Sequence, residues 1–420
     1  MIAPTPGSNP ITQQFHLTPQ QAAFLADPAL QKLLDGLGRD GEDIRIVGGA
    51  IRNALLGMPI SDIDLATTAT PDIVMRSSTA AGFKPVPTGI DHGTITVVVD
   101  GQPFEVTTLR QDVETDGRHA RVTFSRDWKA DAQRRDFTIN GLFLTRDGVV
   151  HDFVGGRADI ATRTVRFIGD PDRRIREDYL RILRLFRFHA TYGVGPLDRA
   201  GLDAAIRGGR GLRRLSGERV QAELFKLLGA AGAVAMSRAL ADAGLFGILL
   251  GGVPRLVRLT RLADLEAALD LPPDPVRRLG ALGLFKAEDA ERIRARLRLS
   301  NETASRLAAM AVSPTGLHAS PATDAEARPL LYRLGAGTFL DRVLIHAAGQ
   351  GGDPHAWLAL AELPRRWPMP TFPITGHDLA ARGIKPGPTL GAALRRLEQA
   401  WIDAGFPSDP AWKADALRDT

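Results

Sequence analysis

The chain has 420 residues, of which 44% are hydrophobic and 24% are charged, and it contains no cysteine. This length predicts more than one domain. The proportions of hydrophobic and charged residues, with the absence of cysteine, exclude collagen-like, disordered and disulfide-stapled proteins. The lack of cysteine excludes thiolate catalysis, iron–sulfur clusters and cysteine-based zinc sites. The formal net charge of +5, carried mainly by arginine, is compatible with an anionic partner.

No stretch reaches the roughly 18 uninterrupted apolar residues of a membrane-spanning helix. The most apolar segment, residues 229–253, is interrupted by Arg238 and Asp242. No Lys or Arg precedes Lys32, so the charged start of a secretory signal is not visible. We therefore expect a cytoplasmic protein that does not associate with a membrane.

Turn and cap signals divide the first part of the chain into short elements. Residues 1–25 are polar and are predicted to form a loose arm. Strands are predicted at 44–47, 63–66, 94–99, 104–109, 137–145 and 149–153, and helices at about 19–37, 50–56 and 71–81. Residues 111–128 are charged and without periodicity, which predicts a mobile loop.

From about residue 173 the hydrophobic spacing becomes helical and stays so to the end. We therefore predict an α/β head followed by an all-α remainder. Gly- and Pro-rich breaks divide the helical half. The predicted divisions are an arm (1–25), a head (26–168), a helical neck (169–230), a helical body (231–345) and a helical tail (346–420).

The first motif with chemical meaning joins two glycines to two acids. Gly48 and Gly49 lie between a predicted strand and a predicted helix, where backbone N–H groups favour an anion, and Arg52 follows one turn later. Asp62 and Asp64 are two apart on a strand, so both carboxylates face one side. Such a pair can hold Mg²⁺ against triphosphate oxygens. Each half alone is more often a turn or a solvated strand end, but together they favour a phosphate and metal site.

Two further groups are candidates. Glu105 alternates with apolar neighbours on the predicted strand 104–109 and is either a third carboxylate of the site or a solvent-facing residue. The run Arg134-Arg135-Asp136-Phe137-Thr138-Ile139-Asn140 could hold a phosphate or a base. Its alternative interpretation is a surface cluster of ion pairs.

The segment 176–188 is predicted to be one largely buried helix, with Asp178 and Arg181 one turn apart and Arg184 and Arg187 further along. A carboxylate accepts from an exocyclic amine, and a guanidinium donates to a ring nitrogen. Cytosine and adenine share that pattern, whereas uracil and guanine do not. Asp178 with Arg181 could therefore select C and A, or could belong to an internal ion-pair network.

The ordered set of these motifs resembles the class II tRNA nucleotidyltransferase and poly(A) polymerase family, and is most similar to bacterial CCA-adding enzymes. A second match lies near the end of the chain. It comprises Ile374-Thr375-Gly376-His377-Asp378-Leu379, Gly383-Ile384-Lys385-Pro386-Gly387-Pro388 and the segment from Trp401 to Phe406. The resemblance therefore covers both ends of the chain.

The resemblance implies a polymerase-β-type nucleotidyltransferase head and the addition of C and A to the 3′ end of tRNA from CTP and ATP with Mg²⁺. Asp62 and Asp64 would hold two Mg²⁺ ions for a two-metal phosphoryl transfer, with Glu105 as a third catalytic candidate. The nucleotide would be bound by Gly48, Gly49, Arg52, Arg135, Asp178, Arg181, Arg184 and Arg187. The body and tail would grip the acceptor arm and elbow of the tRNA, and no obligate protein partner is expected.

Two residues depart from the family pattern. Asn53 stands where an Asp is more usual, which questions a salt bridge there, and Gly141 stands where Ala is usual. Several alternatives stay open: a poly(A) polymerase, an enzyme that adds only A or only C, and a non-catalytic RNA-binding protein on the same fold. An enzyme acting on a small molecule is disfavoured by the long basic helical half. The run 65–70 lacks the basic-aromatic stretch associated with bacterial poly(A) polymerases, which favours CCA addition.

Overall fold

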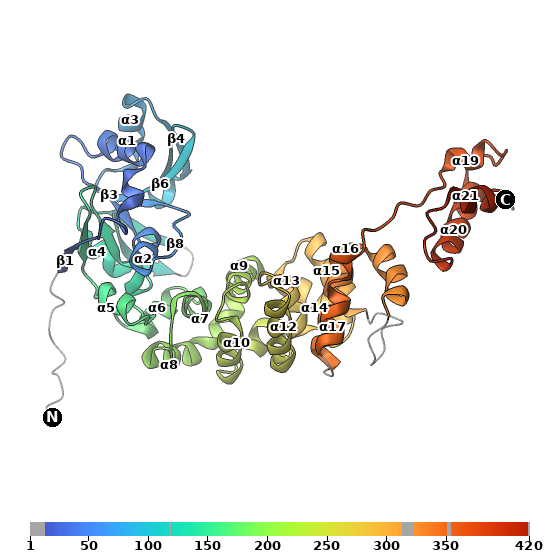
Figure 1. Cartoon of the computed structure of the whole chain (residues 1–420). Coiled ribbons are helices and arrows are strands. Elements are labelled where there is room, and N and C mark those ends of the chain that lie inside the picture. Colours follow the sequence, from blue (N-terminus) through green and yellow to red (C-terminus); the bar gives the residue numbers. More distant parts are fainter. Residues whose placement is uncertain (1–12, 117–118, 313–322, 351–353, 419–420) are drawn as a thin grey trace. The chain divides into compact units, whose positions relative to one another are not determined.

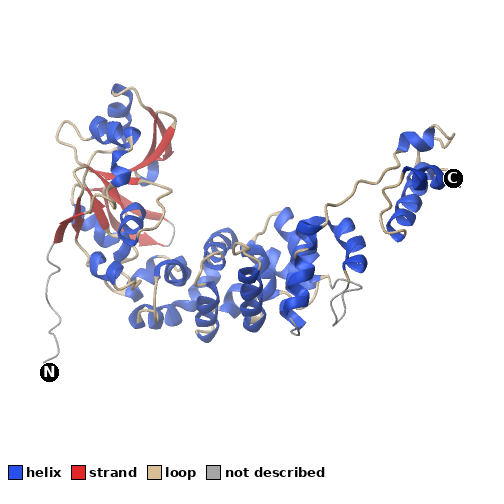
Figure 2. Cartoon of the chain, in the orientation of Figure 1, coloured by secondary structure: helices blue, strands red, loops and turns tan. Residues whose placement is uncertain are grey.

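The computed structural model describes residues 13–116, 119–312, 323–350 and 354–418. Contacts divide the chain into two units, residues 1–249 and 250–420. The first unit contains a mixed α/β head followed by helices, and the described part of the second unit is helical (Figures 1 and 2). The predicted fold class is therefore confirmed, whereas the division into arm, head, neck, body and tail stays a prediction.

A twisted sheet forms the centre of the head. Within the described residues its strand order is β1-β10-β9-β2-β3-β6-β5-β4. Strands β3 and β6 run parallel, and the other neighbouring strands are antiparallel. The strands are β1 (Gln13–His16), β2 (Ile44–Val47), β3 (Asp64–Thr67), β4 (Lys84–Gly89), β5 (Thr94–Val99), β6 (Gln102–Thr108), β9 (Leu142–Leu144) and β10 (Val149–Asp152).

Local signals explain much of this sheet. The predicted turn between β5 and β6 is present, with Asp100 and Gly101 both at positive φ (51° and 85°), as a two-residue hairpin turn requires. On one face of the sheet, Val47, Ala66 and Phe143 pack with residues of the helix α4 (Trp128–Arg134) in a buried cluster. The ends of β2 and β3 that carry the glycines and aspartates are thereby fixed on a packed core.

Helices cover the sheet and continue beyond it. In the first unit they are α1 (Pro28–Leu37), α2 (Gly49–Leu56), α3 (Pro71–Ala80), α4 (Trp128–Arg134), α5 (Gly156–Ala161), α6 (Pro171–Glu177), α7 (Leu180–Tyr192), α8 (Arg199–Gly208), α9 (Gly217–Leu228), α10 (Ala233–Asp242) and α11 (Phe246–Leu250). Short 3₁₀ turns are η1 (Ala23–Ala26), η2 (Ile90–His92), η3 (Thr138–Asn140) and η4 (Gly209–Arg214). Phe188 on α7 packs against Phe137 of the head, with ring centroids 5.1 Å apart. This contact fixes α7 beside the sheet.

Four expectations for the head were wrong in part. The predicted helix at about 19–37 is instead η1 followed by the shorter α1, because Asp27 begins α1 by accepting from the N–H of Leu30 at 2.9 Å. Residues 13–16 of the predicted loose arm pair with β10 as the edge strand β1, and residues 1–12 lie outside the described part. The predicted loop 111–128 instead contains most of a hairpin of β7 (Arg110–Asp116) and β8 (His119–Phe124), whose mostly polar residues pair through their backbone groups. The predicted strand 137–145 splits into η3 and β9.

The second unit comprises α12 (Leu256–Ala268), α13 (Pro275–Gly283), α14 (Glu288–Leu297), α15 (Asn301–Ala311), α16 (Asp324–Gln350), α17 (Pro354–Ala361), α18 (Leu363–Arg366), α19 (Gly376–Ala380), α20 (Pro388–Asp403) and α21 (Pro410–Ala416). Near the end of the chain, Ile374, Leu379, Leu397 and Leu417 form a separate small core. A capping box between Thr375 and Asp378 begins α19. The second family-like motif thus folds around its own hydrophobic centre.

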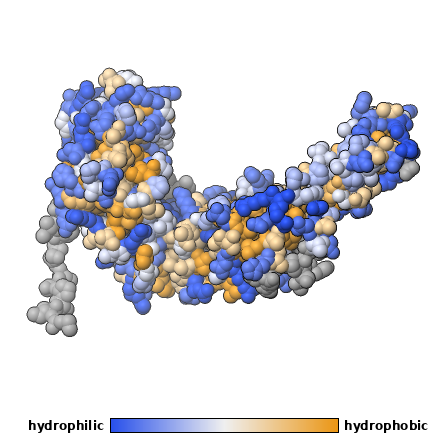
Figure 3. Space-filling model, viewed as in Figure 1, coloured by the Kyte–Doolittle hydropathy of each residue, from blue (hydrophilic) through white to orange (hydrophobic). Residues whose placement is uncertain are grey.

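Polar and charged residues cover much of the visible face of both units, with hydrophobic residues between them (Figure 3). None of the helices that the structure describes combines the length and the apolar composition needed to cross a lipid bilayer.

Candidate active site

Gly48 and Gly49 join β2 to α2 at the wall of a cavity of about 720 Å³. Gly48 has a φ of 72°, which a residue with a side chain rarely adopts, so the turn itself requires glycine. Gly49 is the first residue of α2. The free N–H groups and the dipole at this helix start favour an anion in the cavity.

Arg52 is a buried cation one turn into α2. Its Nη1 donates to Oδ1 of Asn140 at 2.5 Å, and its Nη2 donates to the hydroxyl of Tyr192 at 2.7 Å. The guanidinium also lies 3.8 Å from the centroid of the Tyr192 ring. Burial lowers the pKa of Arg52 from its usual value. These contacts hold the positive charge in one place without an ion pair to a carboxylate among the described residues.

The family departure at Asn53 does not remove the contact expected next to Arg52. Arg52 donates from Nε and Nη2 to Oδ1 of Asn53, at 3.2 and 2.9 Å, and the Asn53 amide donates to the carbonyl of Pro59 at 2.7 Å. Position 141 favours glycine over alanine for a steric reason, because a Cβ there would lie 2.6 Å from a methyl carbon of Val154. Both departures therefore fit their surroundings.

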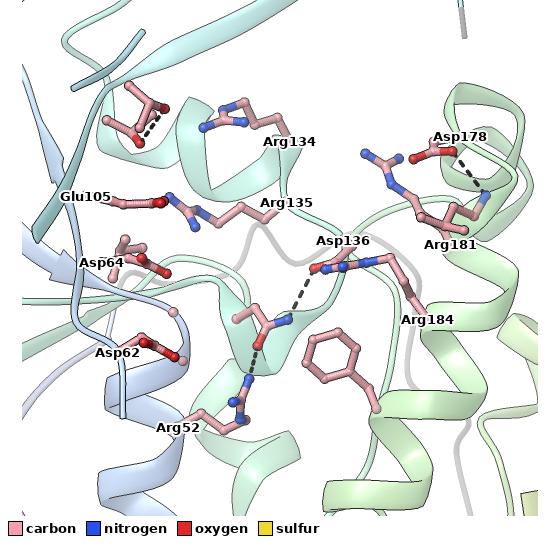
Figure 4. A pocket seen from close by; sticks show the side chains of 18 of the residues that line it. Arg52, Asp62, Asp64, Glu105, Arg134, Arg135, Asp136, Asp178, Arg181 and Arg184 are labelled. Carbon is pink, nitrogen blue, oxygen red and sulfur yellow. Dashed lines mark hydrogen bonds and ion pairs between the residues drawn. The ribbon is translucent and has the colours of Figure 1, made fainter. Parts of the chain in front are cut away.

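Three carboxylates lie on one side of the cavity, in Asp62, Asp64 and Glu105 (Figure 4). Asp64 begins β3 and pairs in register with Glu105 on the parallel strand β6. The pKa of Asp64 is raised, first because the cavity wall removes water from it and then because the Glu105 and Asp62 carboxylates repel its charge. Arg135 opposes this shift. The cavity therefore contains a concentration of negative charge that a cation would relieve.

Arg135 lies between these carboxylates and the opposite wall (Figure 4). It donates to Asp131 at 2.9 and 3.2 Å, and Arg134 donates to the other oxygen of the same carboxylate at 2.6 Å. Asp131 is fully buried on α4, and the two arginines hold its pKa below the usual range against the effect of burial. One buried acid thus orients two arginines toward the cavity.

Asp136 connects the head to α7. Its carboxylate accepts from Arg184 at 2.8 and 2.5 Å and from the Asn140 amide at 3.2 Å. Because Asn140 also accepts from Arg52, a continuous chain of hydrogen bonds runs from α2 to α7 (Figure 4). The predicted run 134–140 is therefore the framework of the cavity and not a surface cluster.

Glu223 on α9 anchors two more arginines from behind. It accepts from Arg187 at 2.9 Å and lies 3.5 Å from Arg184, and it is only 6% exposed. The Arg187 guanidinium also lies 3.8 Å from the ring centroid of Phe188. Both arginines line the cavity. Their ion pairs with Asp136 and Glu223 hold them in place there.

The predicted single helix 176–188 is broken at Asp178. Asp178 has an extended backbone (φ −154°, ψ 110°) between α6 and α7, and its side chain accepts from the N–H of Leu180 at 3.0 Å. An Asp in this position favours a new helix start over continuation. The expectation that Asp178 and Arg181 lie one turn apart on one helix was therefore wrong.

Asp178 and Arg181 also have different partners from those expected. Asp178 accepts from Arg219 at 2.7 Å, and Arg181 donates to Glu177 at 2.5 Å. Both side chains nevertheless line the cavity on the wall opposite the three carboxylates (Figure 4). Each of the two side chains is held by its own ion pair, and both Asp178 and Arg181 stay beside the cavity.

The structure brings all the predicted site residues to this one cavity. They are Gly48, Gly49, Arg52, Asp62, Asp64, Glu105, Arg135, Asp178, Arg181, Arg184 and Arg187. The sequence reasoning missed the partners that hold them, namely Asp131, Tyr192, Glu223 and Arg219, the last of which also lines the cavity. Of these, Asp131 had a signal, since it lies three residues before Arg134 on α4 and four residues before Arg135, which caps that helix. The arrangement suits a ligand that is anionic and accompanied by a cation.

Comparison with known proteins gives consistent matches. A family model described as the poly(A) polymerase head domain matches residues 44–166. "CCA tRNA nucleotidyltransferase 1, mitochondrial" of Mus musculus is 34% identical over 394 residues, covering 90% of this chain and 87% of that protein. The "CCA-adding enzyme" of Limosilactobacillus fermentum is 32% identical over 399 residues, covering 91% and 94%.

Solved structures agree. The crystal structure of the Bacillus stearothermophilus CCA-adding enzyme in complex with CTP has a TM-score of 0.69 and 29% identity to this chain. The match covers 90% of this chain and 94% of that chain. The similarity therefore extends well beyond the head.

Proposed function

The chain belongs to the CCA-adding tRNA nucleotidyltransferases, and we propose that it adds C and A nucleotides to the 3′ end of tRNA from CTP and ATP. Membership agrees with the family identified from the sequence motifs. The observation that carries the proposed function is the head cavity, where carboxylates that form no ion pair with the described residues face anchored arginines. The substrate would be a nucleoside triphosphate with its divalent cation.

The carboxylates fit a divalent cation, for which we propose Mg²⁺. Hard carboxylate oxygens suit Mg²⁺. The pKa of Asp64 is raised first by its loss of contact with water and then by the charges of Glu105 and Asp62, and a cation would relieve this repulsion. In the described part of the chain no group of three or more ligating side chains is assembled, so phosphate oxygens would complete a shell begun by Asp62 and Asp64. When bound, the metal lowers the pKa of an attacking hydroxyl and neutralises charge on a leaving pyrophosphate. Glu105, in register with Asp64, completes the proposed catalytic group.

The triphosphate would lie between the start of α2 and the arginine wall. The Gly48-Gly49 backbone lets the phosphates approach closely, and Arg52 and Arg135 supply fixed positive charge. Because Asn140, Tyr192 and Asp131 already orient these two guanidiniums, little side-chain freedom is lost on binding. The 3′ oxygen of tRNA forms the new bond to the α-phosphorus as the bond to pyrophosphate breaks.

Base selection is proposed for Asp178 and Arg181. A carboxylate that accepts from the exocyclic amine and a guanidinium that donates to the adjacent ring nitrogen would admit C and A but not U or G. Arg219 and Glu177 hold the two groups from behind, which limits their movement. Arg184 and Arg187, anchored by Glu223, would complete the binding of base and phosphates.

The proposed function is tested with tRNA that lacks its 3′ CCA and with each labelled nucleotide separately. We expect incorporation from CTP first and then from ATP, and none from UTP or GTP. Long A-only products would identify a poly(A) polymerase, and a product of a single base type would identify an enzyme restricted to C or A. Binding of RNA without any extension would identify a non-catalytic protein.

Two expectations accompany this function. The acceptor arm and elbow of tRNA are proposed to lie on the body and tail, so removal of residues 350–420 should impair the use of tRNA far more than nucleotide binding. The cytoplasmic location stays a prediction, since the relatives include both bacterial and mitochondrial proteins.

A further inference from the structure

The second unit contains two arginine clusters that differ in how their charge is neutralised. In the first, Arg277 and Arg278 donate to Glu266 at 3.1 and 2.8 Å, and Arg277 and Arg306 donate to Asp341 at 2.8 and 2.6 Å. Glu266 and Asp341 are each 1% exposed. We call this group the closed network, because its acids and arginines satisfy one another inside the fold.

The second cluster comprises Arg255, Arg258 and Arg342, which line a cavity of about 280 Å³ between α12, α13, α15 and α16. Arg258 is 8% exposed and donates from Nε and Nη2 to two consecutive backbone carbonyls of α13. Arg342 donates from Nε to the carbonyl of Ala309 at 2.7 Å. Within the described residues, none of the three arginines forms an ion pair with a carboxylate. We call this the body cavity.

Leaving three guanidiniums together without an acid is unfavourable. Burial, with the nearby charge of Arg255, lowers the pKa of Arg258 to about 10, and burial also lowers the pKa of Arg342. Buried charges are normally paired, as the closed network shows. The planar fork of arginine is suited to a phosphate, which accepts two parallel hydrogen bonds.

The rim of the body cavity distinguishes between sources of phosphate. Phe285 and Val312 line it and are 58% and 47% exposed. The Arg255 guanidinium lies 4.6 Å from the Phe285 ring centroid. A free phosphate ion would make no use of this apolar rim, whereas a nucleotide offers a base or ribose to pack on an aromatic ring beside its phosphate.

We propose that the body cavity binds a backbone phosphate of RNA, with the adjoining nucleotide packed against Phe285. The inference rests on the proposed function, because the RNA would be the tRNA substrate. Arg258 provides the fixed inner charge, and Arg255 and Arg342 close on the phosphate from the rim. The body cavity binds no incoming nucleotide, which belongs to the head cavity.

The test measures equilibrium binding of tRNA lacking CCA, without nucleotide, across a range of salt concentrations. Arg255→Gln and Arg342→Gln avoid the buried Arg258, and Phe285→Ala removes the ring. Arg261→Gln is the matched control, since Arg261 is exposed on the same α12 and forms no ion pair among the described residues. We expect each arginine variant to weaken tRNA binding about tenfold and to lower the salt slope by about one. Phe285→Ala should weaken binding several-fold at an unchanged slope, and Arg261→Gln should change little.

Three outcomes would overturn the inference. The first is unchanged tRNA affinity of the arginine variants beside a lowered melting temperature, which would make the cluster structural. The second is a loss of tRNA affinity no larger than that of Arg261→Gln, which would indicate that only the overall positive charge of the surface contributes to binding. The third is stabilisation of the wild type by inorganic phosphate or pyrophosphate that the variants lose, with tRNA affinity retained, which would assign the cavity to a free anion. Failure of the proposed function would appear elsewhere, as absence of extension by the wild type.

Discussion

Charged side chains have opposite arrangements in the head cavity and in the closed network of the second unit. In the closed network, Glu266 and Asp341 are almost wholly buried and each accepts from two arginines. In the head cavity, Asp62, Asp64 and Glu105 form no ion pair among the described residues and lie beside open space. The difference teaches that buried acids and arginines that pair with one another form a scaffold. Charged groups that are held in place without a partner of opposite charge instead indicate a binding site.

The largest expected effect is on the open carboxylates. Asp64→Asn and Asp62→Asn should each lower the rate of nucleotide addition by about a thousandfold or more, because electrostatic stabilisation at such a centre is a large contribution. Neither variant should melt at a lower temperature than the wild type, since each removes a repulsion. Steady-state rates with CTP and Mg²⁺, together with thermal melting, provide the measurement. Near-normal turnover in Asp62→Asn would contradict the assigned role.

The closed network should respond in the opposite way. Asp341→Asn removes a buried carboxylate that both Arg277 and Arg306 contact, and breaking a buried pair costs about 3–5 kcal/mol. The two arginines keep their contacts with Glu266 and Asp274. Urea unfolding should show this loss, while the rate per folded molecule with saturating tRNA stays near that of the wild type. A large loss of rate without loss of stability would place this network in the chemistry.

A smaller effect is expected on selectivity. Asp178→Ala should raise the use of UTP and GTP relative to CTP and ATP by about tenfold, since one hydrogen bond to the base is worth roughly 1–3 kcal/mol. Arg219→Gln is the matched control, because it breaks the same ion pair but leaves the carboxylate beside the cavity. If both variants lose stability and neither changes the nucleotide ratios, Asp178 is part of the scaffold.

The smallest expected effect is a pH dependence of stability. The folded-state pKa of Asp64 lies above its ordinary value near 3.8. The folded protein therefore binds this proton more tightly than the unfolded chain, and the ionised carboxylate lowers stability above the folded pKa. The gain in stability of Asp64→Asn over the wild type should be present at neutral pH and shrink as pH falls through that pKa. A gain that grows on acidification would contradict the sign.

The site was predictable where its chemistry is local in sequence. Gly48-Gly49 forms one turn, and Asp62 and Asp64 lie just before and at the start of β3, and the structure brings all four residues to the same cavity. Their roles stay proposals. The supports of the arginines were not predictable, because Glu223 reaches Arg184 and Arg187 only after α9 packs on α7.

The predicted helix 176–188 and the predicted loop 111–128 were wrong for the same reason. Both predictions relied on the spacing of hydrophobic residues and gave too little weight to hydrogen bonding by the local backbone. The break at Asp178 was hidden because the apolar pattern continues across it, although an Asp two residues before Leu180 is a capping signal. The hairpin β7–β8 was missed because most of its residues are polar or charged, while its ladder is made by backbone groups. Charged segments without helical periodicity can thus still be strands.

The most direct measurement compares Asp64→Asn with Asp341→Asn in one experiment, recording the rate of C addition per folded molecule and the free energy of unfolding in urea. The account predicts that Asp64→Asn loses about a thousandfold or more in rate with no loss of stability, and that Asp341→Asn loses about 3–5 kcal/mol of stability with little change in rate. If the two variants lose rate and stability in the same proportion, the distinction between open and closed charges is contradicted.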